Sequence, residues 1–207
     1  MLTWIIKGGP MMWIILACGV VGTAVFLAKL YELHRAQIRP GDFLKGLYNI
    51  LNRNNIVEAV SICEETPGPV ASVVRAAILH HDEERPVIQR AVEEAGLAEI
   101  PRLERNLTVI ATIAQISPLL GLLGTVLGMI QVVMVIEQKA PLVQSGDLMN
   151  GLWQALLATA AGLLVSIPAY AGYNFLVSRV ESILLDMERA AVEILAFLAG
   201  SARRHGE

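Results

Sequence analysis

The sequence predicts an all-α integral membrane protein with three transmembrane helices, two of them long and extending into a cytoplasmic helical bundle. Hydrophobic residues make up 55% of the 207 residues and charged residues 17%, whereas soluble domains are about 25% charged. Three uncharged runs are long enough to cross a bilayer. The polar stretch between the first two has apolar residues at helical spacing. Together these observations argue against an ordinary soluble domain.

The first uncharged run, residues 8–28, matches the ~20 residues that cross a bilayer as a helix. We therefore assign residues 1–30 to a periplasmic N-terminus and the first transmembrane helix. Residues 106–136 and 148–178 form the second and third spans. Each would be roughly 46 Å long at about 1.5 Å per residue, whereas the hydrocarbon core is about 30 Å thick. Both long helices are therefore expected to continue into water on the cytoplasmic side.

Lysine and arginine gather at one side of the three predicted spans, which sets their orientation. That side carries Lys29, Arg35, Arg39, Lys45, Arg102, Arg105, Arg179 and Arg189, against Lys7 and Lys139 on the other. The loop 137–147 is accordingly expected in the periplasm. Residues 31–105 form a cytoplasmic helical region, and residues 179–207 form a cytoplasmic C-terminal helix.

The two cysteines, Cys18 and Cys63, predict neither a disulfide framework nor a metal site, because no Cys/His cluster has zinc spacing. Residues 15–18 faintly resemble a lipoprotein cleavage site. The apolar run continues for about ten residues beyond Cys18, where the core of a cleaved leader would already have ended. Cys18 is therefore interpreted as a small residue packed inside a membrane helix.

Residues 31–105 are expected to form several helices. Asp42 can cap the first, and Asn54 or Asn55 can cap the second. The Pro-Gly-Pro stretch at 67–69 breaks the pattern. A third helix then covers about 70–81.

The acidic residues at 82–84 open a fourth helix, with Pro86 in its first turn. Its apolar positions lead directly into the second span, with Pro101 as a candidate kink.

The sequence carries no constellation typical of an enzyme. His80 and His81 are adjacent, so on a helix their side chains point about 100° apart, which suits a solvated helix end better than a metal site. Glu93 and Glu94 are read as a solvated helix face. No nucleophile with its base and no phosphate-binding glycine loop is recognisable. The net charge of -3 gives no reason to expect a nucleic-acid partner, and no metal or cofactor is expected.

The third span carries small or hydroxylated residues at alternating steps of four and three, which place them on one helix face. They are Ala155, Thr159, Gly162, Ser166, Ala169 and Tyr173. This stripe has two interpretations: close helix packing through small residues, or a polar pore lining.

The second span repeats the theme on two faces joined at Pro118. Thr108, Thr112 and Gln115 share one face, and Pro118, Gly121, Thr125 and Gly128 share the other. Gly124 and Gly128 also form a small-xxx-small pair that permits close backbone approach. Taken alone, the pattern favours packing over a pore.

Neither long span contains Asp, Glu, Lys, Arg or His. Proton relays in membranes usually use an ionisable carrier, and these spans offer only hydroxyls, tyrosines and side-chain amides, among them Gln115, Gln131 and Gln154. If the chain conducts protons, another polypeptide must supply a carboxylate.

The stretches 117–130, 155–163 and 167–169 resemble the MotA/TolQ/ExbB proton channel family, nearest the ExbB and TolQ members. The resemblance implies a homopentamer in the bacterial inner membrane whose second and third helices line a channel. An ExbD/TolR-like dimer would occupy the channel and carry the proton on an aspartate facing Thr125 and Thr159. Proton flow would then drive a TonB- or TolA-like protein. ExbB and TolQ commonly carry a glutamate five residues before the third-helix threonine, where this chain has Gln154, which can hydrogen-bond but cannot titrate.

Two sets of site residues follow. The expected proton pathway comprises Thr125, Thr159, Thr112, Gln115, Ser166, Tyr173 and Gln154. The expected helix-packing residues are Pro118, Gly121, Gly124, Gly128 and Gly162. The alternative to a motor stator is a non-conducting membrane scaffold that packs through small-residue faces, with a membrane enzyme as a remote third.

Overall fold

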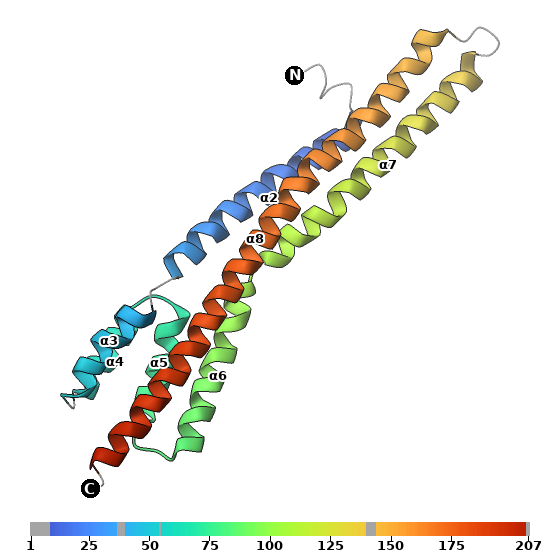
Figure 1. Cartoon of the computed structure of the whole chain (residues 1–207). Helices are drawn as coiled ribbons and strands as arrows, with labels where there is room; N and C mark the ends of the chain where they lie inside the picture. The colour runs from blue at the N-terminus through green and yellow to red at the C-terminus, as the bar shows by residue number, and fades with distance from the viewer. Residues whose placement is uncertain (1–8, 37–39, 54, 140–143, 206–207) are drawn as a thin grey trace. The chain divides into compact units, whose positions relative to one another are not determined.

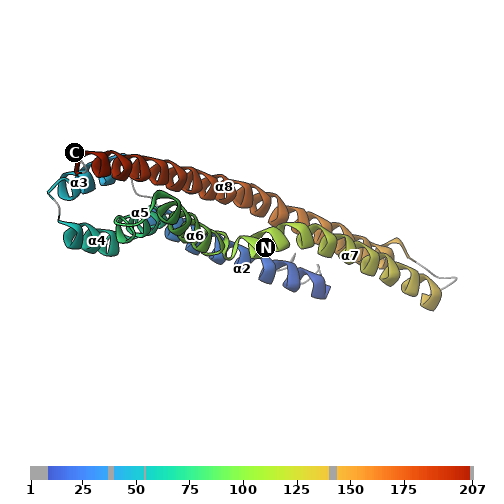
Figure 2. The same ribbon diagram turned by 90° about the horizontal axis from the view of Figure 1, so that it is seen from below.

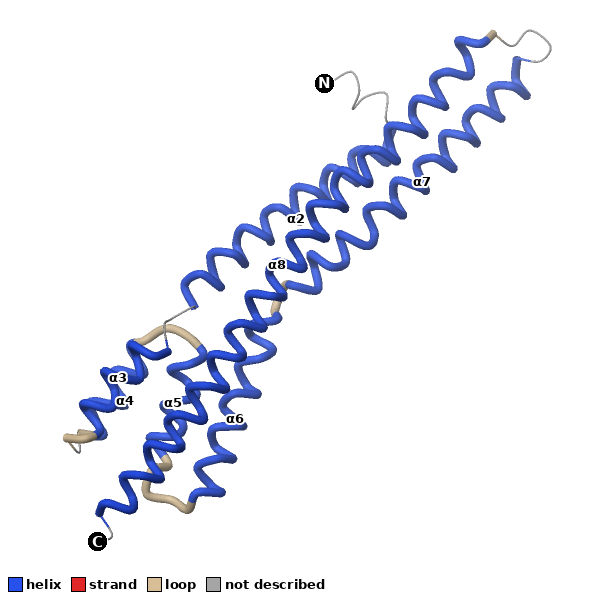
Figure 3. Tube along the Cα trace, viewed as in Figure 1, coloured by secondary structure: helices blue, strands red, loops and turns tan. Residues whose placement is uncertain are grey.

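The computed structural model describes residues 9–36, 40–53, 55–139 and 144–205. Within these ranges the chain is helical with short connections and contains no strand (Figure 3), which confirms the predicted all-α class. The chain divides into two compact units. We call Met1–Lys29 with Asn106–Phe175 the membrane unit, and Leu30–Arg105 with Leu176–Glu207 the bundle unit.

Three helices are long and apolar enough to cross a membrane (Figure 1). They are α2 (Gly9–Ala36), α7 (Leu107–Lys139) and α8 (Ser145–His205). They contain the predicted spans from residue 9 to 28, from 107 to 136 and from 148 to 178; residue 8 lies outside the described residues and Asn106 precedes α7. Helix α8 runs for 61 residues without interruption, so the predicted third span and C-terminal helix are one element.

Four shorter helices lie in the bundle unit: α3 (Pro40–Leu51), α4 (Ile56–Glu65), α5 (Pro69–Leu79) and α6 (Arg85–Glu104). Asn55 caps α4 as expected, its side-chain oxygen accepting the N–H of Glu58 at 3.4 Å. Asp42 is not the cap of α3. The helix already begins at Pro40, whose ring suits a first helical position, so Asp42 lies in the first turn.

The connection before α5 and the end of α5 both follow local chemistry. Gly68 adopts a φ of +134°, a conformation open to glycine, and Pro69 starts the helix. Helix α5 ends at Leu79 rather than at the predicted His81. The Nδ1 atoms of His80 and His81 lie 2.9 Å and 3.0 Å from the carbonyl oxygens of Ala76 and Ile78. These rings therefore occupy a helix end, the interpretation favoured from the sequence.

The break between the fourth bundle helix and the second span lies at Arg105 and Asn106, not at Pro101. Pro101 is accommodated inside α6. Asn106 has a φ of +68°, a left-handed conformation that asparagine tolerates better than most residues. That residue ends one helical run and lets α7 begin at Leu107.

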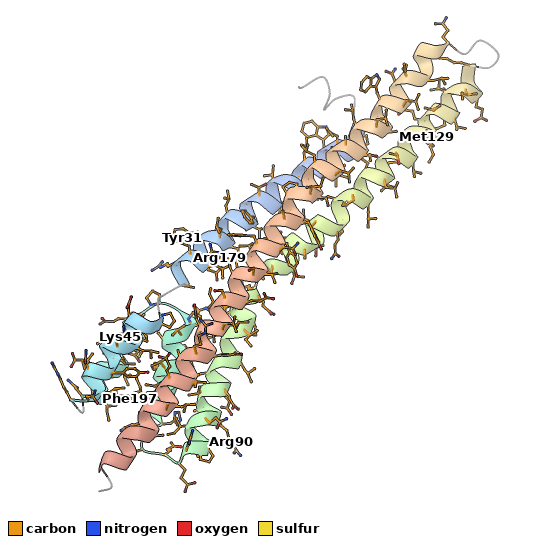
Figure 4. The ribbon with its side chains drawn as sticks, in the orientation of Figure 1. Tyr31, Lys45, Arg90, Met129, Arg179 and Phe197 are labelled. Atoms are coloured by element: carbon orange, nitrogen blue, oxygen red, sulfur yellow. The ribbon has the colours of Figure 1, made fainter. Side chains whose placement is uncertain are left out.

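The core of the bundle unit centres on α5, which packs against α4 and α6 (Figure 2). Most of α5 is buried, including Val73, Val74 and Ile78. Helix α8 contributes buried residues at alternating steps of four and three: Leu176, Val180, Ile183, Met187, Ala190 and Ile194. The ring of Phe197, labelled in Figure 4, stacks on Tyr48 of α3 with centroids 4.4 Å apart.

Candidate functional site

Within the membrane unit, α7 and α8 lie side by side and antiparallel, with their backbones in direct contact (Figure 1). A Cβ atom built on Gly162 would lie 2.6 Å from the carbonyl oxygen of Ser117, and one built on Gly128 would lie 2.6 Å from that of Gly151. A Cβ on Gly121 would lie 3.1 Å from the oxygen of Ala158. We call this contact the α7–α8 seam. Gly162 and Gly128 leave no room for a Cβ unless the backbones shift, and a Cβ on Gly121 would be in tight contact.

Of the remaining packing candidates, Gly124 also belongs to the seam. A Cβ on Gly124 would collide with the methyl group of Ala158. Pro118 lies inside α7, partly exposed, next to the fully buried Ser117. Gly151 was missed in the sequence, although it continues the stripe one turn before Ala155.

Two hydroxyl groups of the α8 stripe cross the seam. The hydroxyl of Ser166 donates to the carbonyl oxygen of Ala114 at 2.7 Å. The hydroxyl of Thr159 lies 3.3 Å from the carbonyl oxygens of both Gly121 and Ala155. One hydrogen cannot serve both acceptors fully, so Thr159 is held more loosely than Ser166.

Thr125 opens instead onto a surface of α7. Its hydroxyl donates to the carbonyl oxygen of Leu122, one turn earlier in the same helix, at 2.5 Å. The residue borders a groove of about 410 Å³ whose other walls are apolar side chains of α7. They are Val126, Met129, Ile130, Val133 and Met134, of which Met129 is labelled in Figure 4.

The other predicted pathway residues lie apart from the seam hydroxyls. Thr112 and Gln115 are exposed on α7, and the hydroxyl of Thr112 donates to the carbonyl oxygen of Thr108. Gln154 is partly buried beside Gly9, the first residue of α2. Tyr173 is partly exposed on α8. The predicted pathway residues are therefore not gathered in one place. Thr159 and Ser166 lie in the seam, whereas the others lie on other surfaces of α7 and α8.

Between residues 107–136 and 148–175 the two long helices of the membrane unit carry hydroxyls, side-chain amides and backbone carbonyls as polar groups, and no Asp, Glu, Lys, Arg or His. The chain belongs to the MotA/TolQ/ExbB proton channel family, whose model matches residues 65–189. This match includes both α7 and the membrane part of α8, and it confirms the family resemblance seen in the sequence.

Individual relatives agree with the family. The biopolymer transport protein ExbB of Aquifex aeolicus is 42% identical over 51% of this chain and 73% of its own length. The Tol-Pal system protein TolQ of Haemophilus influenzae is 40% identical over 47% of this chain, and the match spans 42% of that protein. The biopolymer transport protein exbB1 of Vibrio cholerae is 23% identical over 93% of this chain and 86% of its own length. A membrane proton-channel role follows for this chain.

Proposed function

We propose that the chain is the pore-forming stator subunit of an ExbB/TolQ-type motor in the bacterial inner membrane. In this proposal an ExbD/TolR-like dimer occupies the channel of a homopentamer and carries the proton. Proton flow then energises a TonB- or TolA-like protein. The names of the relatives, which describe biopolymer transport and the Tol-Pal system, support this choice.

The observation that carries the proposal is the chemistry of the two long spans. Residues 106–136 and 148–178 contain hydroxyls but no ionisable side chain apart from the tyrosines. A carboxylate that passes between threonine hydroxyls can be stabilised by a hydrogen bond and released again, whereas a fixed charge in the wall would hold it in one place. The chain therefore supplies the wall, and the titrating group comes from the partner helix.

Thr125 is the residue best placed to meet that partner. It lies at the edge of an apolar groove formed by α7 alone, and a membrane helix can cover such a groove with its own apolar side chains. Thr159 of α8 lies opposite Gly121, which is one helical turn before Thr125 on α7. Its loosely held hydroxyl can rotate toward a passing carboxylate at small cost.

The basic residues support a topology with the N-terminus and the loop 137–147 in the periplasm and the bundle unit in the cytoplasm. The energy scale is adequate for a motor. A charge crossing a membrane releases ~2.3 kcal/mol per 100 mV, so one proton at about 150 mV delivers ~3.5 kcal/mol. This is comparable to a few helix–helix contacts exchanged during rotation.

Substitution of the two threonines tests the proposal. Thr125→Val and Thr159→Val remove the hydroxyl at constant shape and should abolish proton-driven function in cells, while the Thr→Ser variants should retain it. Thr23→Val is the matched control, because the Thr23 hydroxyl also donates within its own membrane helix, at 2.8 Å, yet lies outside the proposed pathway. Full activity of both valine variants would contradict the proposal.

Native mass spectrometry of the detergent-solubilised chain tests the assembly. The proposal expects five copies that take up two partner helices. A monomer or dimer that ignores every ExbD/TolR-like partner would refute the pentameric stator.

The alternative, a non-conducting scaffold, is favoured by one observation. Ser166 is buried in the seam and Thr159 is partly so, and both donate to backbone carbonyls. A scaffold predicts that Thr159→Val is tolerated while Gly162→Leu disrupts folding or assembly. The stator proposal predicts that both variants lose function. Thr159→Val should assemble normally but fail to conduct protons, whereas Gly162→Leu should fail to fold or assemble.

A further inference from the structure

Pro118 leaves a gap in the hydrogen bonding of α7. In an α-helix the carbonyl of residue 114 accepts the N–H of residue 118, and proline has no N–H to give. The Ala114 carbonyl therefore lacks its regular helix bond. In the structure the hydroxyl of Ser166, from α8, donates to that oxygen at 2.7 Å.

This bond lies inside the protein. Ser166 is 9% exposed and Ala114 is 4% exposed. A carbonyl at membrane depth that has lost its partner is costly, and a hydroxyl from a neighbouring helix is a recognised way to satisfy it. By contrast, the hydroxyls of Thr112 and Ser117 donate to carbonyls of their own helix.

A second contact of the same kind, between a hydroxyl of α8 and a carbonyl oxygen of α7, lies further along the seam. Thr159 lies seven residues before Ser166 on α8, and its acceptor Gly121 lies seven residues after Ala114 on α7. Seven residues are about two helical turns, so both contacts fall on the same face of each antiparallel helix. The shorter contact is the one at the proline.

We infer that Ser166 is a positioning residue: it completes the hydrogen bonding of the Ala114 carbonyl at the Pro118 break and thereby fixes the register of α8 on α7. The register set at Ser166 holds Thr159 opposite Gly121, two turns away. Ser166 acts on the proton pathway through Thr159 and does not meet the proton itself. Only this last link, to proton conduction, rests on the proposed function.

The test is a double-mutant cycle on the full chain in detergent micelles, with the unfolding equilibrium measured by titration with a denaturing detergent. Ser166→Ala should lower the folding equilibrium constant roughly three- to tenfold in the wild-type background, the range of hydrogen bonds between membrane helices. Pro118→Ala restores the N–H of residue 118. In that background Ser166→Ala should change the constant less than twofold.

Ser117→Ala is the matched control, because Ser117 is also buried and is adjacent to the proline. Its hydroxyl donates to Ile113, whose carbonyl keeps its regular helix bond with residue 117. The control should therefore cost the same in both backgrounds. Equal losses for Ser166→Ala in both backgrounds would overturn the inference, since Ser166 would then contribute ordinary packing unrelated to the proline.

A second pair of variants decides the matter if Pro118→Ala does not fold. Ser166→Thr and Ser166→Val have nearly the same shape, but only threonine keeps the hydroxyl. The threonine variant should be several-fold more stable than the valine variant and, with the partner in liposomes, should conduct protons faster. Equal stability of the two variants would refute the positioning role. Because stability is measured without the partner, its outcome is independent of whether the motor proposal holds.

Discussion

Gly162 offers the most direct test of the seam, through the substitution Gly162→Ala. The added Cβ would lie 2.6 Å from the Ser117 oxygen and 3.0 Å from the Cα of Gly121, whereas ordinary contact begins at 3.4 Å. Both obstacles are backbone atoms, so no side chain can rotate away and the helices must separate locally. Overpacking of this kind costs about 1–3 kcal/mol. Alanine returns up to about 1 kcal/mol through its better helix propensity.

We therefore expect Gly162→Ala to destabilise the chain by up to about 2 kcal/mol, the overpacking cost less the gain in helix propensity. Gly146→Ala is the control on the same helix, because a Cβ there would meet nothing within 4 Å, and it should be neutral or slightly stabilising. Unfolding by denaturing detergent, followed by helix circular dichroism, measures both variants. If Gly162→Ala were at least as stable as the wild type while the control behaved as expected, the backbone contact would be refuted.

Three further predictions concern the bundle unit. Burial raises the pKa of the Cys63 thiol from 9.0 to about 11, although the charge of Arg75 acts in the opposite direction. Between these two pH values the folded thiol stays neutral while the unfolded thiol ionises, so the free energy of unfolding should fall as the pH rises. In a Cys18→Ser background, iodoacetamide should also react more slowly with the folded chain than with the unfolded chain. Asn55→Ala should cost about 1 kcal/mol by removing the α4 cap while Asn55→Asp costs less, as measured by thermal unfolding of the two variants side by side. A double-mutant cycle of Tyr48→Leu and Phe197→Leu should give a coupling of about 0.5–1.5 kcal/mol in denaturant unfolding, and additive losses would rule out the ring stack.

The sequence was sufficient to predict the spans, because an uncharged run of 20 or more residues has few alternatives to a membrane helix. It was less informative about where helices end. The expected continuation of the third span is observed, because α8 runs on through the charged residues from Arg179 onward; helix geometry is indifferent to the change from an apolar to an amphipathic pattern. Pro101 was the candidate kink, but it is accommodated inside α6, and the helical run ends where Asn106 adopts a left-handed conformation.

The stripe on the third span shows what periodicity cannot decide. Spacing alone places Thr159, Gly162 and Ser166 on one face, but it does not say which neighbour that face meets. The answer depends on contacts between residues about 50 positions apart, such as Ser166 with Ala114. Pro118 and Ser166 were both singled out in the sequence, yet their connection through a missing N–H becomes visible only once the two helices are placed together.

The close pairing of α7 and α8 also bears on the order in which the chain folds. Only residues 140–144 separate the two helices, and closing so short a loop costs little conformational entropy. Contacts between neighbouring segments form faster than contacts between distant ones. The second and third spans are therefore expected to pair as a helical hairpin soon after they are synthesised. The Ala114 carbonyl would then gain its hydroxyl donor early in folding, rather than remain exposed to lipid until the rest of the chain assembles.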